Sequence, residues 1–429
     1  MSSPKEKVLL IGVNRNNQPN FQESIEELQN LAIACEYEVI GKTIQNLKAI
    51  HPATYIGPGK VEEAKSQLKE QKANLVIFNN ELSPSQIRNL EEEWETKVLD
   101  RTSLILEILA KRAKTREAKL QVEVARLQYA LPKLIGSNES LGRQSGGVGN
   151  KNRGSGEKKL ELDRRKIEEK ISDLQKELDT LENERKTQKK MRNKTDLPTV
   201  ALVGYTNAGK STLMNAMVEL FHKSESKKVF EKDMLFATLE TSVRKITLPD
   251  HKSILLSDTV GFVNHLPHEL VKAFRSTLDE LRDADLLLHV IDSSHPNYQL
   301  QIQVTEETLV QIGANEIPTI LVFNKADLTS QDLPSVEGDK VTLSAKKKIG
   351  IEELIYVVQK KVFNQTIKCK FLVPYEQGKI VSYLNENANI ESVAYETNGT
   401  LLTVECREQD FHRFKEYIWE EEVSYEYKT

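Results

Sequence analysis

Hydrophobic positions recur along the first hundred residues with two alternating periods. Short apolar runs at residues 8–11, 37–40 and 75–78 have the composition of strands, and stretches with apolar residues every three or four positions separate them. Ser83 and Pro84 open a further helix, because serine caps a helix and proline fits its first turn. This order predicts a small α/β domain with a parallel sheet over residues 1–100.

The pattern changes at Arg101, where long charged stretches carry apolar residues at spacings of three and four. Residues 136–156 interrupt these stretches and contain seven glycines in 21 positions. We therefore predict an antiparallel helical hairpin over residues 101–195 with a glycine-rich loop at its tip. The apolar faces of its two helices are predicted to be Leu120, Val124, Leu127, Leu131 and Leu134, and Ile167, Ile171, Leu174, Leu178 and Leu181.

The last two parts of the chain return to mixed strands and helices. Residues 196–363 alternate strand-like and helical stretches, which predicts a doubly wound sheet. From residue 364 the order is strand, helix, strand, strand, helix, which predicts a small α+β domain of ferredoxin-like type over residues 364–429. The whole chain is thus predicted to be a multidomain α/β protein with four parts.

Charge is nearly balanced over the whole chain, with 60 Lys and Arg against 64 Asp and Glu and a net charge of −4. A nucleic-acid partner would therefore bind a local basic patch. Residues 101–166 supply one, since they contain sixteen Lys and Arg against seven Asp and Glu. A basic loop at the end of a hairpin favours contact with RNA. A solvated linker is the alternative, and residues 136–166 contain no aromatic side chain for base stacking.

Cysteine content and hydropathy bear on the compartment. Cys35, Cys369 and Cys406 are few and far apart, as expected for reduced thiols in a cytosolic protein. The first residues lack the apolar core of a secretory signal, and the apolar runs are too short to span a bilayer. We expect a cytoplasmic monomer, with peripheral association with a membrane left open.

The strongest chemical signal is an eight-residue loop between a predicted strand and a predicted helix. Its backbone N–H groups and the positive end of the helix dipole can surround a polyphosphate. Lys210 can neutralise β- and γ-phosphate oxygens, and the Ser211 hydroxyl can bind Mg²⁺. The predicted phosphate loop consists of Gly204, Tyr205, Thr206, Asn207, Ala208, Gly209, Lys210 and Ser211. The Gly-Pro-Gly-Lys motif at residues 57–60 lacks this spacing, so we expect a structural turn there, with a weak phosphate site as the alternative.

Motifs further along the chain select the base. Asp327 follows a predicted strand, where its carboxylate can accept both the N1–H and the exocyclic amine of guanine. Adenine lacks this pair of donors, so the nucleotide is predicted to be GTP. Lys325 is expected to lie along the base and Asn324 to brace the loop. The predicted base-binding residues are Asn324, Lys325, Ala326 and Asp327, joined through backbone contacts by Ser344, Ala345 and Lys346.

Two further segments are predicted to contact the metal and the γ-phosphate: Phe236, Ala237, Thr238, Leu239 and Glu240, and then Asp258, Thr259, Val260 and Gly261. Asp258 can hold Mg²⁺ directly or through water, and the Gly261 N–H can reach the γ-phosphate. Thr238 is our candidate for a second hydroxyl ligand of Mg²⁺, with Thr241 as the alternative. The predicted metal ligands are Ser211, Thr238 and Asp258, and the predicted catalytic groups are Lys210, Thr238 and Gly261.

Together these motifs predict a P-loop GTPase domain over residues 196–363. Beyond them, the chain resembles the HflX family of GTPases over essentially its whole length. The family-specific segments are residues 55–62, 99–106, 121–125, 146–149 and 154–157, and Ser155 replaces the proline of the family's usual Arg-Gly-Pro-Gly. The resemblance implies association with the large ribosomal subunit, a hairpin loop that approaches ribosomal RNA near the peptidyl transferase centre, and GTP-dependent splitting or rescue of stalled ribosomes.

Residue 262 bears on the mechanism of hydrolysis. Ras-like enzymes carry a water-positioning glutamine after Asp-x-x-Gly, whereas this chain carries Phe262, which cannot orient water by hydrogen bonding. We therefore predict slow intrinsic hydrolysis that a partner, the ribosome, accelerates. Asn207 is also found in GTPases that use K⁺, so K⁺ is an additional candidate cofactor. His265 and His268 lack further ligands at zinc spacing, so we expect them to be surface histidines.

Two other functions compete with a ribosome-remodelling GTPase. In the first, GTP gates a regulatory protein that binds another RNA or a protein complex. In the second, the chain is a P-loop kinase, which is least favoured because Asp327 specifies guanine and no acceptor site is visible in the sequence.

Overall fold

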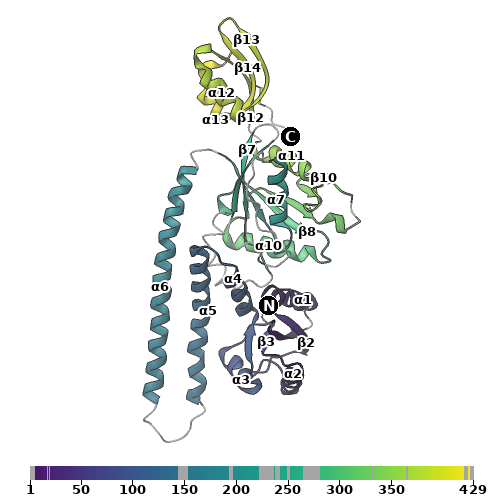
Figure 1. Ribbon diagram of the computed structural model, residues 1–429, viewed down its shortest axis with the longest axis vertical. Coiled ribbons are helices and arrows are strands. Elements are labelled where there is room, and N and C mark those ends of the chain that lie inside the picture. The colour runs from purple at the N-terminus through teal and green to yellow at the C-terminus, as the bar shows by residue number, and fades with distance from the viewer. Residues whose placement is uncertain are drawn as a thin grey trace. The chain divides into compact units, whose positions relative to one another are not determined.

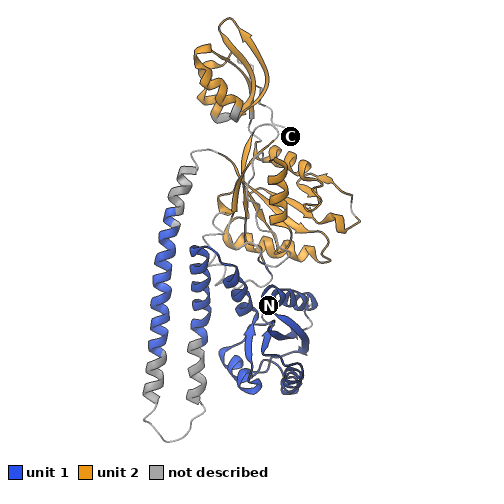
Figure 2. Cartoon of the chain, viewed as in Figure 1, with its two compact units in different colours: residues 1–190, 232–240, 263–276 blue, residues 191–231, 241–262, 277–429 orange. Residues whose placement is uncertain are grey.

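The computed structural model describes residues 5–16, 18, 20–143, 153–192, 197–221, 236, 242–248, 252–263, 281–330, 332–363, 366–419 and 424–425. Figure 1 gives the order of the elements, and Figure 2 shows two compact units. The first comprises residues 1–190, 232–240 and 263–276, and the second comprises residues 191–231, 241–262 and 277–429. The predicted domain boundaries at residues 100, 195 and 363 stay predictions.

The first unit begins with the predicted parallel sheet. Its strand order is β2-β1-β3-β4, and all three neighbouring pairs are parallel. The strands are β1 (Lys7–Arg15), β2 (Glu38–Leu47), β3 (Leu75–Phe78) and β4 (Lys97–Asp100), and the accompanying helices are α1 (Phe21–Ala34), α2 (Pro58–Gln71), α3 (Pro84–Trp94) and α4 (Arg101–Arg112). The motif at residues 57–60, expected to be a turn, instead starts α2, since Gly57 caps the helix and Pro58 fits its first turn.

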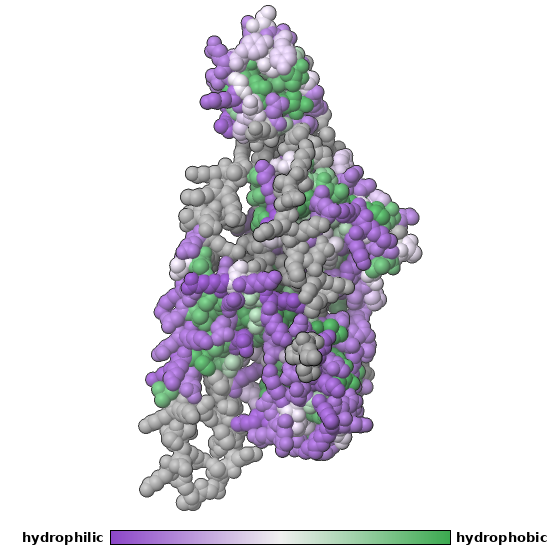
Figure 3. Space-filling model, viewed as in Figure 1, coloured by the Kyte–Doolittle hydropathy of each residue, from purple (hydrophilic) through white to green (hydrophobic). Residues whose placement is uncertain are grey.

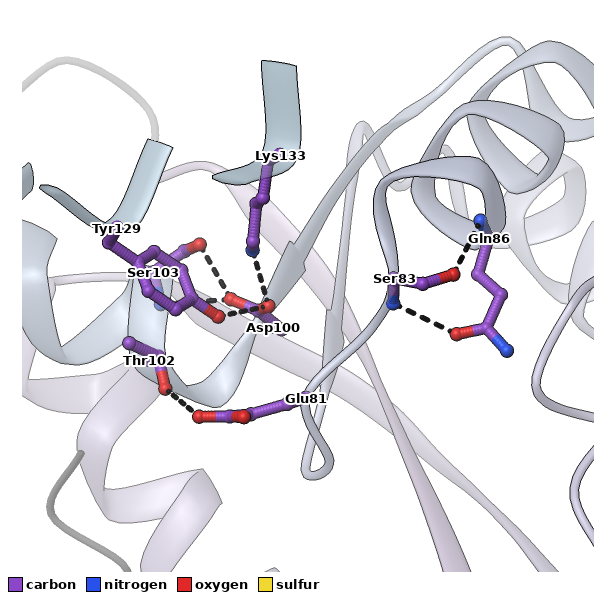
Figure 4. A network of polar contacts seen from close by, with 8 residues as sticks. All are labelled: Glu81, Ser83, Gln86, Asp100, Thr102, Ser103, Tyr129 and Lys133. Atoms are coloured by element: carbon purple, nitrogen blue, oxygen red, sulfur yellow. Dashed lines mark hydrogen bonds and ion pairs between the residues drawn. The ribbon is translucent and has the colours of Figure 1, made fainter. Parts of the chain in front are cut away.

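A buried carboxylate joins β4 to the helix that follows α4. Asp100 is fully buried, caps α4 by accepting from the Ser103 N–H at 2.9 Å, and accepts from the Ser103 hydroxyl at 2.6 Å. Tyr129 donates to it at 2.6 Å and Lys133 at 2.7 Å (Figure 4). Burial alone would raise the pKa of Asp100, but the Lys133 charge and these hydrogen bonds outweigh it and lower that pKa.

Replacing Asp100 should therefore loosen this part of the first unit. We expect Asp100→Ala to lower the stability against local opening by about 2–4 kcal/mol, because it removes a helix cap and leaves Lys133 without its buried partner. Hydrogen exchange of the amides of α4 and of the residues around Tyr129 and Lys133 in the full chain measures this. Lys176→Ala is the control, since Lys176 and Asp173 form an exposed ion pair. An Asp100→Ala effect below about 0.5 kcal/mol would contradict the prediction.

The pKa of Asp100 is lower in the folded protein than in the unfolded chain, where it is about 4. The stabilisation that Asp100 gives to the folded state is therefore complete above about pH 4 and is lost as the pH falls through the pKa of the folded state.

Two long helices follow α4: α5 (Arg116–Arg143) and α6 (Arg153–Arg192). The loop predicted over residues 136–156 was wrong at both ends, because α5 continues to Arg143 and α6 already begins at Arg153. They run antiparallel, as the ion pairs Arg116–Glu177 at 2.6 Å and Lys170–Glu123 at 2.8 Å require. Val124 and Ile171, from the two predicted apolar faces, are buried. We call this pair of helices the arm. No helix in the described ranges is long and apolar enough to cross a membrane.

The second unit contains a seven-stranded sheet in the order β10-β11-β9-β8-β5-β7-β6. The sheet is mixed, because β6 and β10 pair antiparallel with their neighbours while the others pair parallel. The strands are β5 (Thr199–Val203), β6 (Ser242–Thr247), β7 (Ser253–Asp258), β8 (Leu286–Asp292), β9 (Thr319–Asn324), β10 (Ser335–Glu337) and β11 (Lys340–Thr342), and the helices are α7 (Lys210–Phe221), α10 (Tyr298–Ile312) and α11 (Ile351–Val362).

The end of the chain forms a four-stranded antiparallel sheet in the order β13-β14-β12-β15. Its elements are β12 (Thr366–Val373), α12 (Gly378–Asn387), β13 (Asn389–Glu396), β14 (Gly399–Arg407), α13 (Glu408–Arg413) and β15 (Ser424–Tyr425). Cys369 and Cys406 are free, buried thiols with sulfur atoms 3.7 Å apart. Figure 3 shows polar and apolar side chains mixed on this part of the surface, and Val393 and Tyr395 of β13 are exposed.

Candidate nucleotide-binding site

The predicted phosphate loop connects β5 to α7, as the glycine pattern requires. Gly204 and Gly209 have φ angles of 140° and 93°, in the region that favours glycine. A Cβ on Gly204 would collide with the Val290 carbonyl, and one on Gly209 with the Asn324 side chain. Asn207 has a φ of 64°, which asparagine tolerates better than most residues. The backbone of this loop is therefore fixed by residue type as well as by packing.

Lys210 is buried at the start of α7. Its ammonium donates to the carbonyls of Gly204 at 3.0 Å and Tyr205 at 2.8 Å. The backbone of the phosphate loop therefore holds the positive charge of Lys210 within the loop. Burial lowers the pKa of Lys210 to about 8, while the Asp258 charge acts in the opposite direction. His289 on β8 is buried too, and burial together with the Lys210 charge lowers the pKa of His289 to about 4, so it is neutral at physiological pH.

This lowered pKa of Lys210 predicts a pH dependence of nucleotide binding. Phosphate binds the ammonium form, so the affinity for GTP should fall as the pH rises above about 8 and approach a tenfold loss per pH unit. Equilibrium binding between pH 7 and 9 measures it. Lys210→Arg is the control, because arginine stays charged over this range and should flatten the profile. A flat wild-type profile would contradict the prediction.

Oxygen donors gather beside the lysine. The Ser211 hydroxyl donates to the Asp258 carboxylate at 2.7 Å, and Asp258, at the end of β7, is fully buried. A hydroxyl and a carboxylate at this spacing are hard oxygen ligands of the kind that Mg²⁺ prefers. The Thr259 hydroxyl points away and donates to the Leu202 carbonyl at 2.6 Å.

Several predicted residues lie outside the described ranges, namely Ala237, Thr238, Leu239, Glu240, Thr241, His265 and His268. Phe236 is described and buried, with a φ of 54°. Within the described part of the chain, no group of three or more His, Cys, Asp or Glu side chains could hold a metal.

The segment after β7 is tied to the phosphate loop by a parallel bridge. The Phe262 N–H donates to the Gly204 carbonyl at 3.1 Å, and the Thr206 N–H donates to the Phe262 carbonyl at 2.7 Å. The Phe262 side chain is buried, so it packs inside the domain. Gly261 has no room for a side chain, since a Cβ would lie 2.7 Å from the Thr206 Cα and 2.9 Å from the Lys210 ammonium.

The predicted base-binding residues come together at the ends of β9 and β11. The Ser344 hydroxyl donates to Asp327 at 2.7 Å, and Lys347 lies 3.6 Å from the same carboxylate. The hydrogen bond from Ser344 is the main cause that lowers the pKa of Asp327. Asn324 bridges two loops, because its amide donates to the Ala208 carbonyl and accepts from the Ala345 N–H, both at 2.9 Å.

Ala326 is buried in the same cluster, whereas the Lys346 side chain is exposed.

The structure adds a residue that the sequence patterns did not single out. Asp292, the last residue of β8, forms an ion pair with Lys325 at 2.7 Å. Lys325 itself has a φ of 61°, and the ion pair ties its ammonium to the end of β8. The available signal was the position of Asp292 at the carboxyl end of a predicted strand, where ligand sites of parallel sheets form.

Phosphate loop, Asp-x-x-Gly segment and Asn-Lys-x-Asp segment follow β5, β7 and β9 at the carboxyl ends of one sheet. This arrangement defines the class of P-loop GTPases. Comparison with known proteins agrees. Family models described as GTP-binding GTPase N-terminal, GTP-binding GTPase middle region and 50S ribosome-binding GTPase match residues 22–110, 112–192 and 199–325.

Two curated relatives show the family. The GTPase HflX of Caldanaerobacter subterraneus subsp. tengcongensis is 42% identical over 418 residues, which cover 97% of this chain and 95% of that protein. The GTPase HflX of Escherichia coli K12 is 39% identical over 90% of this chain and 89% of that protein. This chain belongs to the HflX family of GTPases; it binds GTP and GDP and hydrolyses GTP.

Among solved structures, a GTP-binding protein from the archaeon Sulfolobus solfataricus in complex with GDP is similar at 25% identity and a TM-score of 0.43. The match covers 83% of this chain and 98% of that one.

Proposed function

We propose that the loop at residues 204–211 binds Mg²⁺·GTP and that the bound state controls association with the large ribosomal subunit. Lys210 and the Gly261 N–H would hold the terminal phosphates, and Asp327 would hold guanine. Ser211, Thr238 and Asp258 would bind Mg²⁺, which neutralises charge on the β- and γ-phosphates when bound. The pairing of the Ser211 hydroxyl with Asp258 supports this ligand set, because the two oxygens lie 2.7 Å apart.

Hydrolysis in the isolated protein is proposed to be slow. Phe262 stands where a water-positioning glutamine would act, and its buried ring and bridged backbone keep it from orienting water. A partner that supplies the missing orientation could accelerate turnover by as much as ~10⁵-fold if it acted like a GTPase-activating protein. We propose that the large ribosomal subunit is this partner.

The arm carries the proposal of a ribosomal partner. Its two helices pair antiparallel, which supports the proposal of a helical hairpin, and the basic, glycine-rich stretch at residues 136–156 lies around their junction in the sequence. Such a tip suits RNA because Lys and Arg neutralise phosphates and a glycine-rich backbone adapts to irregular RNA. The match of residues 199–325 to the model described as 50S ribosome-binding GTPase supports the same partner. We further propose that splitting or rescue of stalled ribosomes follows, and that the last domain is ferredoxin-like.

Turnover in the presence of purified ribosomal subunits tests the proposal. We expect GTP hydrolysis to be slow alone, strongly stimulated by large subunits and little changed by small subunits. Equal rates with and without large subunits would contradict it.

Co-sedimentation separates the proposal from a GTP-gated switch on another target. With a non-hydrolysable GTP analogue the protein should sediment with large subunits, and more than it does with GDP. Free dissociation at low salt, where phosphate contacts are strongest, would favour the switch.

A further inference from the structure

The Thr206 hydroxyl is a buried polar group within the phosphate loop. Thr206 is 6% exposed, and its Oγ1 has no hydrogen-bond partner among the described residues. Other polar side chains around the loop are engaged there: Lys210 donates to two carbonyls, Ser211 to Asp258 and Thr259 to Leu202. A buried hydroxyl without a partner lowers the stability of the folded protein. Its presence is explained if a bound ligand supplies the missing hydrogen-bond partner.

The residues around Thr206 indicate which part of a ligand its hydroxyl would contact. Thr206 lies against Gly261, since a Cβ on that glycine would be 2.7 Å from both the Cα and the Cγ2 of Thr206. The same point is 2.9 Å from the Lys210 ammonium. The backbone of Thr206 is held by its hydrogen bond to the Phe262 carbonyl at 2.7 Å. Thr206 is thus fixed beside the two groups that we assign to the terminal phosphate.

We propose that the Thr206 hydroxyl donates a hydrogen bond to the γ-phosphate of GTP and positions it for attack by water. The inference rests on the nucleotide site proposed above. GDP has no γ-phosphate, so this contact exists only with GTP. In hydrolysis the water oxygen bonds to the γ-phosphorus, the bond to the β–γ bridging oxygen breaks, and the proton of the water goes to the released phosphate. Thr206 stays covalently unchanged, and its hydroxyl orients the γ-phosphate, while the orientation of the attacking water is left to the partner.

Thr206→Val and Thr206→Ser form a matched pair, because valine keeps the shape without the hydroxyl and serine keeps the hydroxyl without the methyl. We expect Thr206→Val to slow single-turnover GTP hydrolysis by about 10- to 100-fold, the effect of one lost hydrogen bond to a charged group. Its affinity for GDP should stay within about twofold of the wild type. Thr206→Ser should retain most of the wild-type rate.

Thermal melting of the nucleotide-free protein separates this role from a structural one. Removing an unpartnered hydroxyl should leave the Tm of Thr206→Val equal to or above that of the wild type. A lower Tm, an unchanged hydrolysis rate, or an equal loss of GDP affinity would overturn the inference, as would a Thr206→Ser rate as low as that of Thr206→Val. Lys210→Ala tests the underlying site separately, since unchanged GDP affinity in that variant would contradict the nucleotide site itself.

Discussion

Asp327→Asn should lower the affinity of this GTPase for GTP by roughly 10²- to 10⁴-fold. Guanine presents two donors, N1–H and the exocyclic amine, and the Asp327 carboxylate can accept both with a full negative charge. The hydrogen bond from Ser344 lowers the pKa of Asp327, so the carboxylate is ionised at neutral pH. Asparagine replaces one acceptor by a donor, which would face the exocyclic amine of guanine.

Xanthosine triphosphate tests whether Asp327→Asn gains affinity for another base as it loses affinity for guanine. Xanthine has a carbonyl where guanine has the amine, so the amide N–H of the introduced asparagine would find an acceptor, and the variant should bind this nucleotide better than the wild type does. Competition binding of both nucleotides to both proteins measures the exchange. Asp339→Asn is the control, since Asp339 pairs with Lys361 on the surface and should leave both affinities within about twofold. Parallel losses for both nucleotides in Asp327→Asn would show that the change disrupts the loop instead of altering base selection.

Replacing residues 140–156 by a short Gly-Ser linker should abolish ribosome-stimulated turnover and leave GTP binding intact. The nucleotide site lies in the second compact unit, whereas the tip belongs to the first. The ion pairs Arg116–Glu177 and Lys170–Glu123 lie outside the deleted segment, so the register of the arm should survive. The expected loss is the whole stimulation, which could reach ~10⁵-fold.

A charge variant of equal length distinguishes the length of the tip from its chemistry. Replacing Arg143, Lys151 and Arg153 by glutamine should weaken association with large subunits and reduce its dependence on salt, because fewer phosphates are neutralised. Stimulated turnover titrated with large subunits at several salt concentrations measures both effects. If the deletion leaves the stimulation unchanged, the tip is a linker and contact with the ribosome lies elsewhere.

Features that depend on neighbouring residues can be predicted from the sequence. The phosphate loop was predicted from eight residues, and its two structurally demanding glycines, Gly204 and Gly209, have the φ angles that only such residues adopt easily. The parallel sheet of the first unit followed from the order of strand-like and helical stretches. The capping of α3 by Ser83 also follows from local chemistry, since Ser83 and Gln86 form a reciprocal pair (Figure 4).

The spacing of apolar residues does not show where one helix ends and the next begins when packing against other elements decides it. The pattern places residues 101–112 with the long helices, yet they form the separate helix α4, whose Leu104, Ile105 and Ile108 are buried. Residues 57–60 start a helix instead of forming a turn. In both segments the chain follows the surface available for packing, which a period of three or four cannot reveal.

Short motifs at the ends of strands were enough to predict a GTP-binding domain, because phosphate binding and base selection depend on a few neighbouring residues. The contacts that hold those motifs together come from the folded chain. Asn324 reaches the Ala208 carbonyl across 116 positions of sequence, and Asp100 reaches Lys133 on another helix. Only the fold leaves the Thr206 hydroxyl buried without a partner among the described residues. Hydrogen bonds and burial between distant residues depend on how whole elements pack, and no local pattern encodes that packing.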